Sequence, residues 1–173
     1  MADTIKFLKV RTVKSPNRAN AHDAGIDFYI PEFTPEFIKD VVEKNPTIRY
    51  DVENTCFWLD GQNRVMIPSG IHCQMATPNR ALIAANKSGV ATKHGLVFGA
   101  QVVDYEYQGE IHLSLINPGK YSVALTPGMK ILQFVETPIY TSEIIVDEVN
   151  KVETFYSSKT TRGAGGFGST DHK

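Results

Sequence analysis

The sequence predicts an all-β fold, an antiparallel sandwich or barrel, with one short inserted helix. Turn-forming combinations of proline, glycine, asparagine and aspartate recur at short intervals between Asp60 and Pro138. Short runs of β-branched and aromatic residues lie between these turns. Only the stretch Pro35–Lys44 has the apolar spacing of an amphipathic helix. This pattern differs from the alternation of strands and helices that builds a parallel sheet.

The helix is predicted over Pro35–Lys44 because both of its ends carry terminal signals. Thr34 supplies an N-cap hydroxyl, proline suits the first helical position, and Glu36 suits the helix dipole. Asn45-Pro46 ends the helix. Its apolar stripe consists of Phe37, Ile38, Val41 and Val42. We therefore interpret residues 33–58 as an insertion, with 47–60 returning to the sheet or lying across it.

Strands are predicted at four places after the insertion. From Ile111 to Ile116, apolar residues alternate with more polar ones, as in a strand with one buried face. The other three runs are short and rich in β-branched residues, namely Val123–Leu125, 131–135 and 144–146. Residues 99–110 resemble a hairpin that begins at Gly99 and carries Asp104 in its middle. We expect neighbouring valines and aromatic residues to desolvate Asp104 partly, which suits a general base.

Composition excludes several classes of protein. A chain of 173 residues suits one domain, and its net charge of −1 provides no field for nucleic acid. No apolar run approaches the roughly 20 residues of a membrane helix, and the first residues lack a signal-peptide pattern. We therefore expect a cytoplasmic protein with neither a nucleic-acid nor a membrane partner. Cys56 and Cys73 lack metal-ligand spacing and are expected to be buried or half-buried thiols.

Residues 157–173 are predicted to form a mobile glycine-rich arm after a β domain of residues 1–156. Residues 163–168 fit the pattern G-x-G-x-x-G, but only five residues follow, too few for the helix of a dinucleotide site. Arg162 offers a fork of donors and Phe167 a ring face for a base, which together suit a nucleotide clamp. The alternative is a plain flexible terminus.

Residues 86–91 combine an ammonium, a hydroxyl and a glycine amide, which suits phosphate oxygens. The alternative is a loop that leads into a short helix. The chain has no phosphate loop of the type that ends in Gly-Lys-Ser/Thr, and no His-Glu-x-x-His or Gly-x-Ser-x-Gly motif. None of the five histidines has ligand spacing, and none is assigned a catalytic role.

Five segments, taken in order, resemble the five motifs of the homotrimeric deoxyuridine triphosphatases (dUTPases): 24–27, 86–91, 102–110, 128–133 and 162–170. The resemblance implies a distorted β-barrel or jelly roll and a homotrimer whose three active sites are shared between chains. It also implies hydrolysis of dUTP to dUMP and pyrophosphate with Mg²⁺. That reaction keeps uracil out of DNA and supplies dUMP for thymidylate synthesis.

The resemblance also implies roles for single residues. Asp104 would activate the water that attacks the α-phosphate, and Tyr107 would lie under the deoxyribose. Asp27 would reach magnesium through water. Uracil would meet the backbone of Gly99, Gln101 and Val103, whereas the phosphates would meet Lys87, Ser88, Gly89 and Gln133. The arm would contribute Arg162 at the γ-phosphate, Phe167 stacked on uracil, and Gly168 and Ser169 as further substrate contacts.

Some features depart from the family pattern. Lys87 and Lys130 stand where arginine is usual, and Gln101 stands where glycine is usual. The insertion 33–58 has no counterpart in the minimal pattern, and it either packs on the chain's own barrel or binds a protein partner. A deoxycytidine triphosphate deaminase would share the fold, but it generally lacks the glycine-rich clamp. A purely binding or regulatory protein is a further alternative, against which the presence of Asp104 and Phe167 argues.

Overall fold

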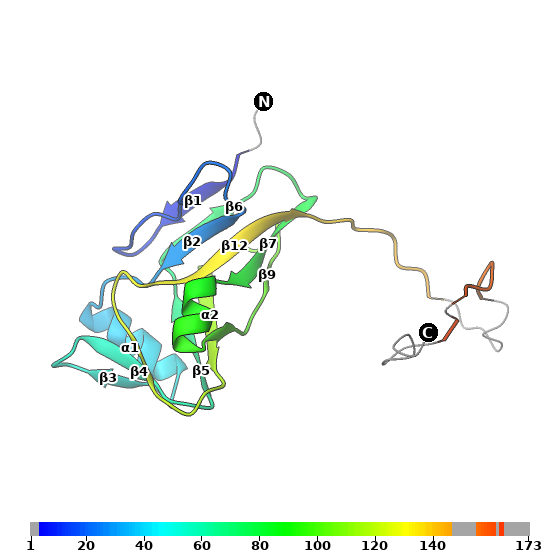
Figure 1. Cartoon of the computed structure of the whole chain (residues 1–173). Coiled ribbons are helices and arrows are strands. Elements are labelled where there is room, and N and C mark those ends of the chain that lie inside the picture. The colour runs from blue at the N-terminus through cyan, green and yellow to red at the C-terminus, as the bar shows by residue number, and fades with distance from the viewer. Residues whose placement is uncertain (1–3, 147–154, 162, 165–173) are drawn as a thin grey trace. The chain divides into compact units, whose positions relative to one another are not determined.

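The computed structural model describes residues 4–146, 155–161 and 163–164 (Figure 1). The chain divides into two compact units, Met1–Tyr140 and Thr141–Lys173, and all described helices and strands lie in the first. The predicted strand at 144–146 is wrong, because these residues are exposed and pair with no described strand. The predicted boundary between a domain of 1–156 and an arm of 157–173 stays a prediction, since 147–154 lie outside the described part.

The described part of the first unit is mostly β-structure, as the sequence predicts, but it has two short helices where one was predicted. The helices are α1 (Pro35–Lys44) and α2 (Ser88–His94). The strands before α2 are β1 (Lys6–Lys9), β2 (Gly25–Tyr29), β3 (Arg49–Asp51), β4 (Cys56–Leu59), β5 (Asn63–Pro68), β6 (Ile71–Gln74) and β7 (Arg80–Asn86). Those after it are β8 (Val97–Phe98), β9 (Val102–Val103), β10 (His112–Asn117), β11 (Val123–Leu125) and β12 (Lys130–Pro138).

The strands form four antiparallel sheets rather than one closed barrel within the described residues. Their orders are β2-β12-β7-β9, β5-β10-β8, β11-β4-β3 and β1-β6. Strand β12 lies between β2 and β7, so that Gln133 faces Asp27 on one side and Ala85 on the other. This register brings the second, fourth and first segments of the motif series together. The alternation predicted around β10 is confirmed, because Ile111, Leu113 and Leu115 are buried.

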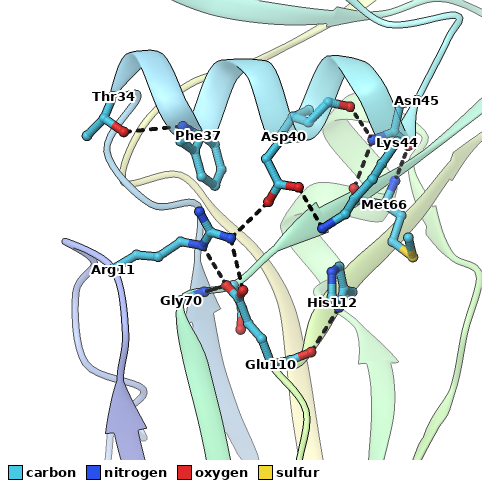
Figure 2. A network of polar contacts seen from close by, with 12 residues as sticks. Arg11, Thr34, Phe37, Asp40, Lys44, Asn45, Met66, Gly70, Glu110 and His112 are labelled. Carbon is cyan, nitrogen blue, oxygen red and sulfur yellow. Dashed lines mark hydrogen bonds and ion pairs between the residues drawn. The ribbon is translucent and has the colours of Figure 1, made fainter.

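Helix α1 has the predicted bounds because its terminal signals operate locally. The Thr34 hydroxyl accepts from the Phe37 amide at 3.2 Å. At the other end, Asn45 donates to the carbonyls of Val41 (2.8 Å) and Met66 (3.0 Å) and accepts from the Met66 amide (2.8 Å) (Figure 2). The side chain of Asn45 therefore ties the end of α1 to β5.

The insertion packs on its own domain. Phe37 and Val41 of α1 are buried, and Phe37 stacks on Phe33 with ring centroids 5.6 Å apart. Phe33 also contacts Phe57 of β4, at 4.6 Å between centroids. Strand β4 in turn pairs with β11, which lies outside the insertion, so the residues after α1 extend a sheet of the β domain. The insertion thus shares the core of the β domain.

The hairpin predicted at 99–110 is wrong in its pairing. Strand β9 pairs with β7, and β10 pairs with β5 and β8, so that residues 104–109 form a turn between strands of different sheets. Asp104 is exposed, and Val102 beside it is itself 57% exposed, so this chain alone does not desolvate the carboxylate as expected. The two cysteines are free thiols, Cys56 buried and Cys73 half-buried, as predicted.

Candidate active site

A cleft of about 240 Å³ opens beside β9 and the turn that follows it. It collects four residues that the sequence predicts as site residues: Gln101, Val103, Asp104 and Tyr107. The remaining lining residues are Met66, Ala100, Val102, Ile111, His112 and Phe134. Ile111 and Phe134 are buried, whereas Asp104 and Tyr107 are exposed, so the cleft has an apolar floor and a polar mouth.

Backbone hydrogen bonds and one glycine fix the turn around Asp104. The Ala84 amide donates to the Gln101 carbonyl at 2.7 Å, which holds the start of the turn against β7. The Tyr107 amide donates to the Asp104 carbonyl at 3.1 Å, and the Tyr107 hydroxyl donates to the Glu110 carbonyl at 2.9 Å. A Cβ at position 109 would lie 2.4 Å from the Tyr107 hydroxyl oxygen, so any larger residue there would displace the Tyr107 side chain from its present position. The turn therefore presents Asp104 in a defined position.

Glu110 connects this turn to distant parts of the chain (Figure 2). Its carboxylate accepts from Arg11 Nε at 2.8 Å, from Arg11 Nη2 at 3.0 Å and from the Gly70 amide at 2.6 Å. Arg11 Nη2 also donates to Asp40 of α1 at 2.8 Å. Burial raises the pKa of Glu110, but the hydrogen bonds from Arg11 and Gly70 outweigh it and leave this pKa below its ordinary value.

A second cluster of charged residues surrounds Asp27. Its carboxylate is 5% exposed and pairs with Lys87 and, at 3.0 Å, with Lys130. Burial raises the pKa of Asp27, but hydrogen bonds and charge from the two lysines outweigh it and leave this pKa low. Gln133 lies opposite Asp27 and donates to the Asn86 carbonyl at 2.8 Å. One carboxylate and two ammonium groups make a site with net positive charge, which suits an anion.

The family model for dUTPases matches residues 48–171. This chain belongs to the dUTPase family. It is 36% identical, over 110 residues, to the deoxyuridine 5'-triphosphate nucleotidohydrolase of Salmonella typhimurium, a match that covers 62% of this chain and 68% of that protein.

Solved dUTPase structures share the fold. The dUTPase of Staphylococcus bacteriophage 80alpha, solved with dUpNHpp, matches with a TM-score of 0.73 at 20% identity over 96% of this chain and 97% of that one. The dUTPase of phage phi11 of S. aureus matches with a TM-score of 0.66 at 17% identity over 84% and 97%, and its structure describes a structural Mg(II) ion. The native EIAV dUTPase matches with a TM-score of 0.59 at 20% identity over 86% of this chain and 100% of that one.

The residues described in this dUTPase do not by themselves fit a magnesium ion. Both oxygens of Asp27 are occupied by ammonium groups, which exclude a divalent cation from direct contact. Elsewhere in the described ranges there is no group of three or more His, Cys, Asp or Glu side chains that could hold a metal. The water-mediated role predicted for Asp27 stays a prediction.

The predicted site residues of this dUTPase fall into separate groups. Lys87 and Gln133 lie in the Asp27 cluster, and Gly99 donates through its amide to the Ser114 carbonyl beside the cleft at 2.9 Å. Ser88 and Gly89 are exposed at the start of α2, which realises the alternative of a loop leading into a short helix, and neither lines the cleft. Four residues lie outside the described part: Arg162, Phe167, Gly168 and Ser169.

Sequence reasoning missed part of the site. His112, Met66, Ile111 and Phe134 line the cleft, and Lys130 completes the Asp27 cluster. One of these residues carried a readable signal. His112 stands at an outward position of a strand whose alternate residues are buried, three residues after Gly109, the last residue of the turn that carries Asp104. The other cleft residues come from strands that only the tertiary fold brings together.

Proposed function

We propose that this chain hydrolyses dUTP to dUMP and pyrophosphate, and so keeps uracil out of DNA and supplies dUMP for thymidylate synthesis. One observation carries the proposal beyond family membership: the cleft presents a carboxylate and an aromatic ring, Asp104 and Tyr107, at its mouth and apolar side chains at its floor. A planar base suits the floor, and a reacting phosphate suits the mouth.

We assign Asp104 as the general base that activates the attacking water. Among the described residues its carboxylate has no ion-pair partner, whereas Asp27 and Glu110 each accept from basic side chains. A carboxylate without a counter-ion is available to accept a proton from water as the water attacks the α-phosphorus. Phosphoryl transfer then depends mainly on positioning this water in line with the leaving pyrophosphate.

The Asp27 cluster is the proposed phosphate site. Lys87 and Lys130 exceed Asp27 by one positive charge, and Gln133, Ser88 and Gly89 add amide and hydroxyl groups nearby in the sequence. Lysine binds phosphate as a point charge, so substrate orientation depends on the surrounding amides more than it would with arginine. We assign the γ-phosphate to Arg162 and stacking on uracil to Phe167, with Gly168 and Ser169 as further contacts, on the resemblance alone.

We propose a homotrimer with shared active sites. Support comes from the separation of the cleft from Ser88 and Gly89 within one chain, and from the exposure of Asp104. A neighbouring copy would bring its phosphate-binding groups to the cleft and would also bury Asp104, which is exposed in the single chain. Light scattering is expected to give three times the monomer mass. A fully active monomer would contradict this proposal.

Magnesium is proposed to enter as part of the substrate, because a triphosphate binds Mg²⁺ through its own oxygens and the described residues form no metal site. No described helix is long and apolar enough to cross a membrane, and the expected cytoplasmic location stays a prediction.

A protein partner at 33–58 also stays a prediction. The larger apolar residues of the insertion pack inside the domain, and Val42 and Val52 are exposed.

The deciding experiment measures pyrophosphate release from dUTP, dCTP, dTTP and UTP, with magnesium and with a chelator. We expect turnover of dUTP alone, and loss of turnover when magnesium is chelated. Release of ammonia from dCTP, measured in the same reactions, without release of pyrophosphate would favour the deaminase alternative. Binding of dUTP without turnover would favour the regulatory alternative.

A further inference from the structure

Arg11 lies between the insertion helix and the end of the turn that carries Asp104 (Figure 2). Its Nε donates to Glu110 Oε1 at 2.8 Å, and its Nη2 donates both to Glu110 Oε2 at 3.0 Å and to Asp40 Oδ2 at 2.8 Å. The Arg11 side chain is only 26% exposed. A planar guanidinium that donates to two carboxylates in this way is held in one orientation. The proposed mechanism gives none of these three side chains a role.

Asp40 holds the guanidinium from a rigid element. It belongs to α1, where Phe37 and Val41 on either side of it in the sequence are buried in the core. The ring of Phe37 also lies against the Arg11 guanidinium, 5.4 Å from its central carbon. The second oxygen of Asp40 accepts from Lys44 of the same helix at 2.7 Å. The position of Asp40 is therefore set by the packing of the insertion.

The turn formed by residues 104–109 is anchored at both of its ends. At its start, β9 pairs with β7, which does not involve the Arg11 network. At its other end, the Glu110 carboxylate accepts from the Gly70 amide at 2.6 Å, and the Glu110 carbonyl accepts from the Tyr107 hydroxyl at 2.9 Å. Arg11 acts on this second anchor, because it holds the Glu110 side chain.

We propose that Arg11 and Asp40 are positioning residues for Asp104: by fixing Glu110 they hold the turn that carries the general base, so that the insertion helix contributes to turnover. The inference rests on the proposed function, because it assumes that Asp104 activates the water. The Glu110 side chain is 15% exposed, so without its cation it is expected to turn towards solvent. Its carbonyl would move with it and release the Tyr107 hydroxyl. A misplacement of about 1 Å in an active site can lower the rate about 10²-fold.

Replacement of Arg11 by lysine separates orientation from charge. Lysine keeps a cation beside Glu110 but lacks the planar fork that donates to both carboxylates. We therefore expect Arg11→Lys to retain most of the stability that Arg11→Ala loses and yet to lower kcat about ten-fold. Affinity for a non-hydrolysable dUTP analogue should change little, because Gln101 and Val103 of the cleft belong to the anchor on β7. Unchanged kcat in Arg11→Lys would overturn the inference.

Replacement of Asp40 tests the contribution of the insertion helix. Asp40→Ala leaves the Arg11–Glu110 pair in place but removes its support, so kcat should fall by a smaller factor than in Arg11→Lys. The double variant should be no slower than Arg11→Lys alone, because both changes act through one guanidinium. Glu43→Ala is the control, since Glu43 lies on the same helix with a side chain 65% exposed and pairs with Lys39. Multiplied losses in the double variant, or an equal loss in Glu43→Ala, would overturn the inference.

Hydrogen exchange on the full chain tests the turn without turnover. The Tyr107 amide donates to the Asp104 carbonyl at 3.1 Å, so its exchange reports whether the turn is held. Exchange over residues 104–110 should be faster in Arg11→Lys and Asp40→Ala than in Glu43→Ala, with exchange of β7 unchanged. Equal exchange of the turn in all three variants would overturn the inference. The expected exchange pattern in a protein that does not hydrolyse dUTP would keep the support of the turn by α1 and contradict the proposed reaction.

Discussion

Arg11 donates to both carboxylate oxygens of Glu110, although the two residues lie 99 positions apart in the chain. The same guanidinium donates to Asp40 of α1 and lies 5.4 Å from the ring centroid of Phe37. Three segments therefore meet at one side chain: the N-terminal segment, the insertion, and the end of the turn that carries Asp104 (Figure 2). The insertion is thus connected to the candidate active site by charge as well as by packing.

Removal of this guanidinium is expected to destabilise the fold. Arg11→Ala leaves Glu110, whose side chain is 15% exposed, without its cation, and should cost about 2 kcal/mol of unfolding free energy. Urea unfolding at one fixed protein concentration measures the change. Arg49→Ala is the matched control, because its pair with Asp60 is exposed at 62% and 36% and should contribute little. An equal loss of unfolding free energy in the two variants would show that the Arg11 network stabilises the fold no more than an exposed ion pair does.

Acid should destabilise the protein through Asp27 and Glu110. Both carboxyls have a pKa below the ordinary values of 3.8 and 4.5, so the unfolded chain binds protons more readily than the folded one. Their stabilising contribution is complete above those ordinary values and is lost as pH falls through the lower folded pKa. We expect the unfolding free energy to fall as the pH drops below about 5, with a shallower slope in Glu110→Gln. Identical slopes would remove Glu110 from the effect.

Asp104→Asn tests the assignment of the base. An amide cannot accept the proton of water, so kcat should fall by about 10² to 10⁴-fold while a non-hydrolysable dUTP analogue still binds. Glu106→Gln is the control, because Glu106 belongs to the same turn but does not line the cleft. Near-normal kcat in Asp104→Asn would remove this carboxylate from the mechanism.

Substitution of Phe167 tests whether the C-terminal arm contacts the base of the substrate. Stacking of a base on an aromatic ring contributes roughly 1–3 kcal/mol, so Phe167→Ala should lower kcat/KM about ten-fold or more. Phe155→Ala, at an exposed position with no assigned role, should have little effect. Truncation after Tyr156 should leave a folded protein with greatly reduced kcat/KM. Full activity of the truncated protein would favour the plain flexible terminus.

Features encoded by neighbouring residues could be predicted from the sequence. Helix α1 has its predicted bounds because Thr34, Pro35 and Asn45 act on the backbone within one turn of themselves. The buried face of β10 could likewise be read from strict alternation. By contrast, residues 144–146 have strand-like composition but pair with no described strand, because propensity alone supplies no partner.

Contacts between distant residues could not be predicted in this way. The ion pair of Asp27 with Lys87 joins positions 60 apart, and the pairing of β9 with β7 replaces the local hairpin that its glycines indicate. Such contacts depend on the register of whole sheets, which a local pattern does not specify. Gln101, Val103, Asp104 and Tyr107 of the cleft were nevertheless identified by their motif, whereas His112 and Phe134 reach it only through the tertiary fold.

The contact between Asn45 and Met66 has a consequence for self-association. Strand β5 lies at the edge of its sheet among the described strands, and an edge strand offers free amides and carbonyls to strands of other molecules. The carboxamide of Asn45 occupies both the amide and the carbonyl of Met66, as a neighbouring strand would. Asn45, at the end of the insertion helix, therefore leaves neither backbone group of Met66 free to pair with a strand of another molecule. Replacement of Asn45 by leucine would reopen a template for intermolecular β-pairing at the centre of β5.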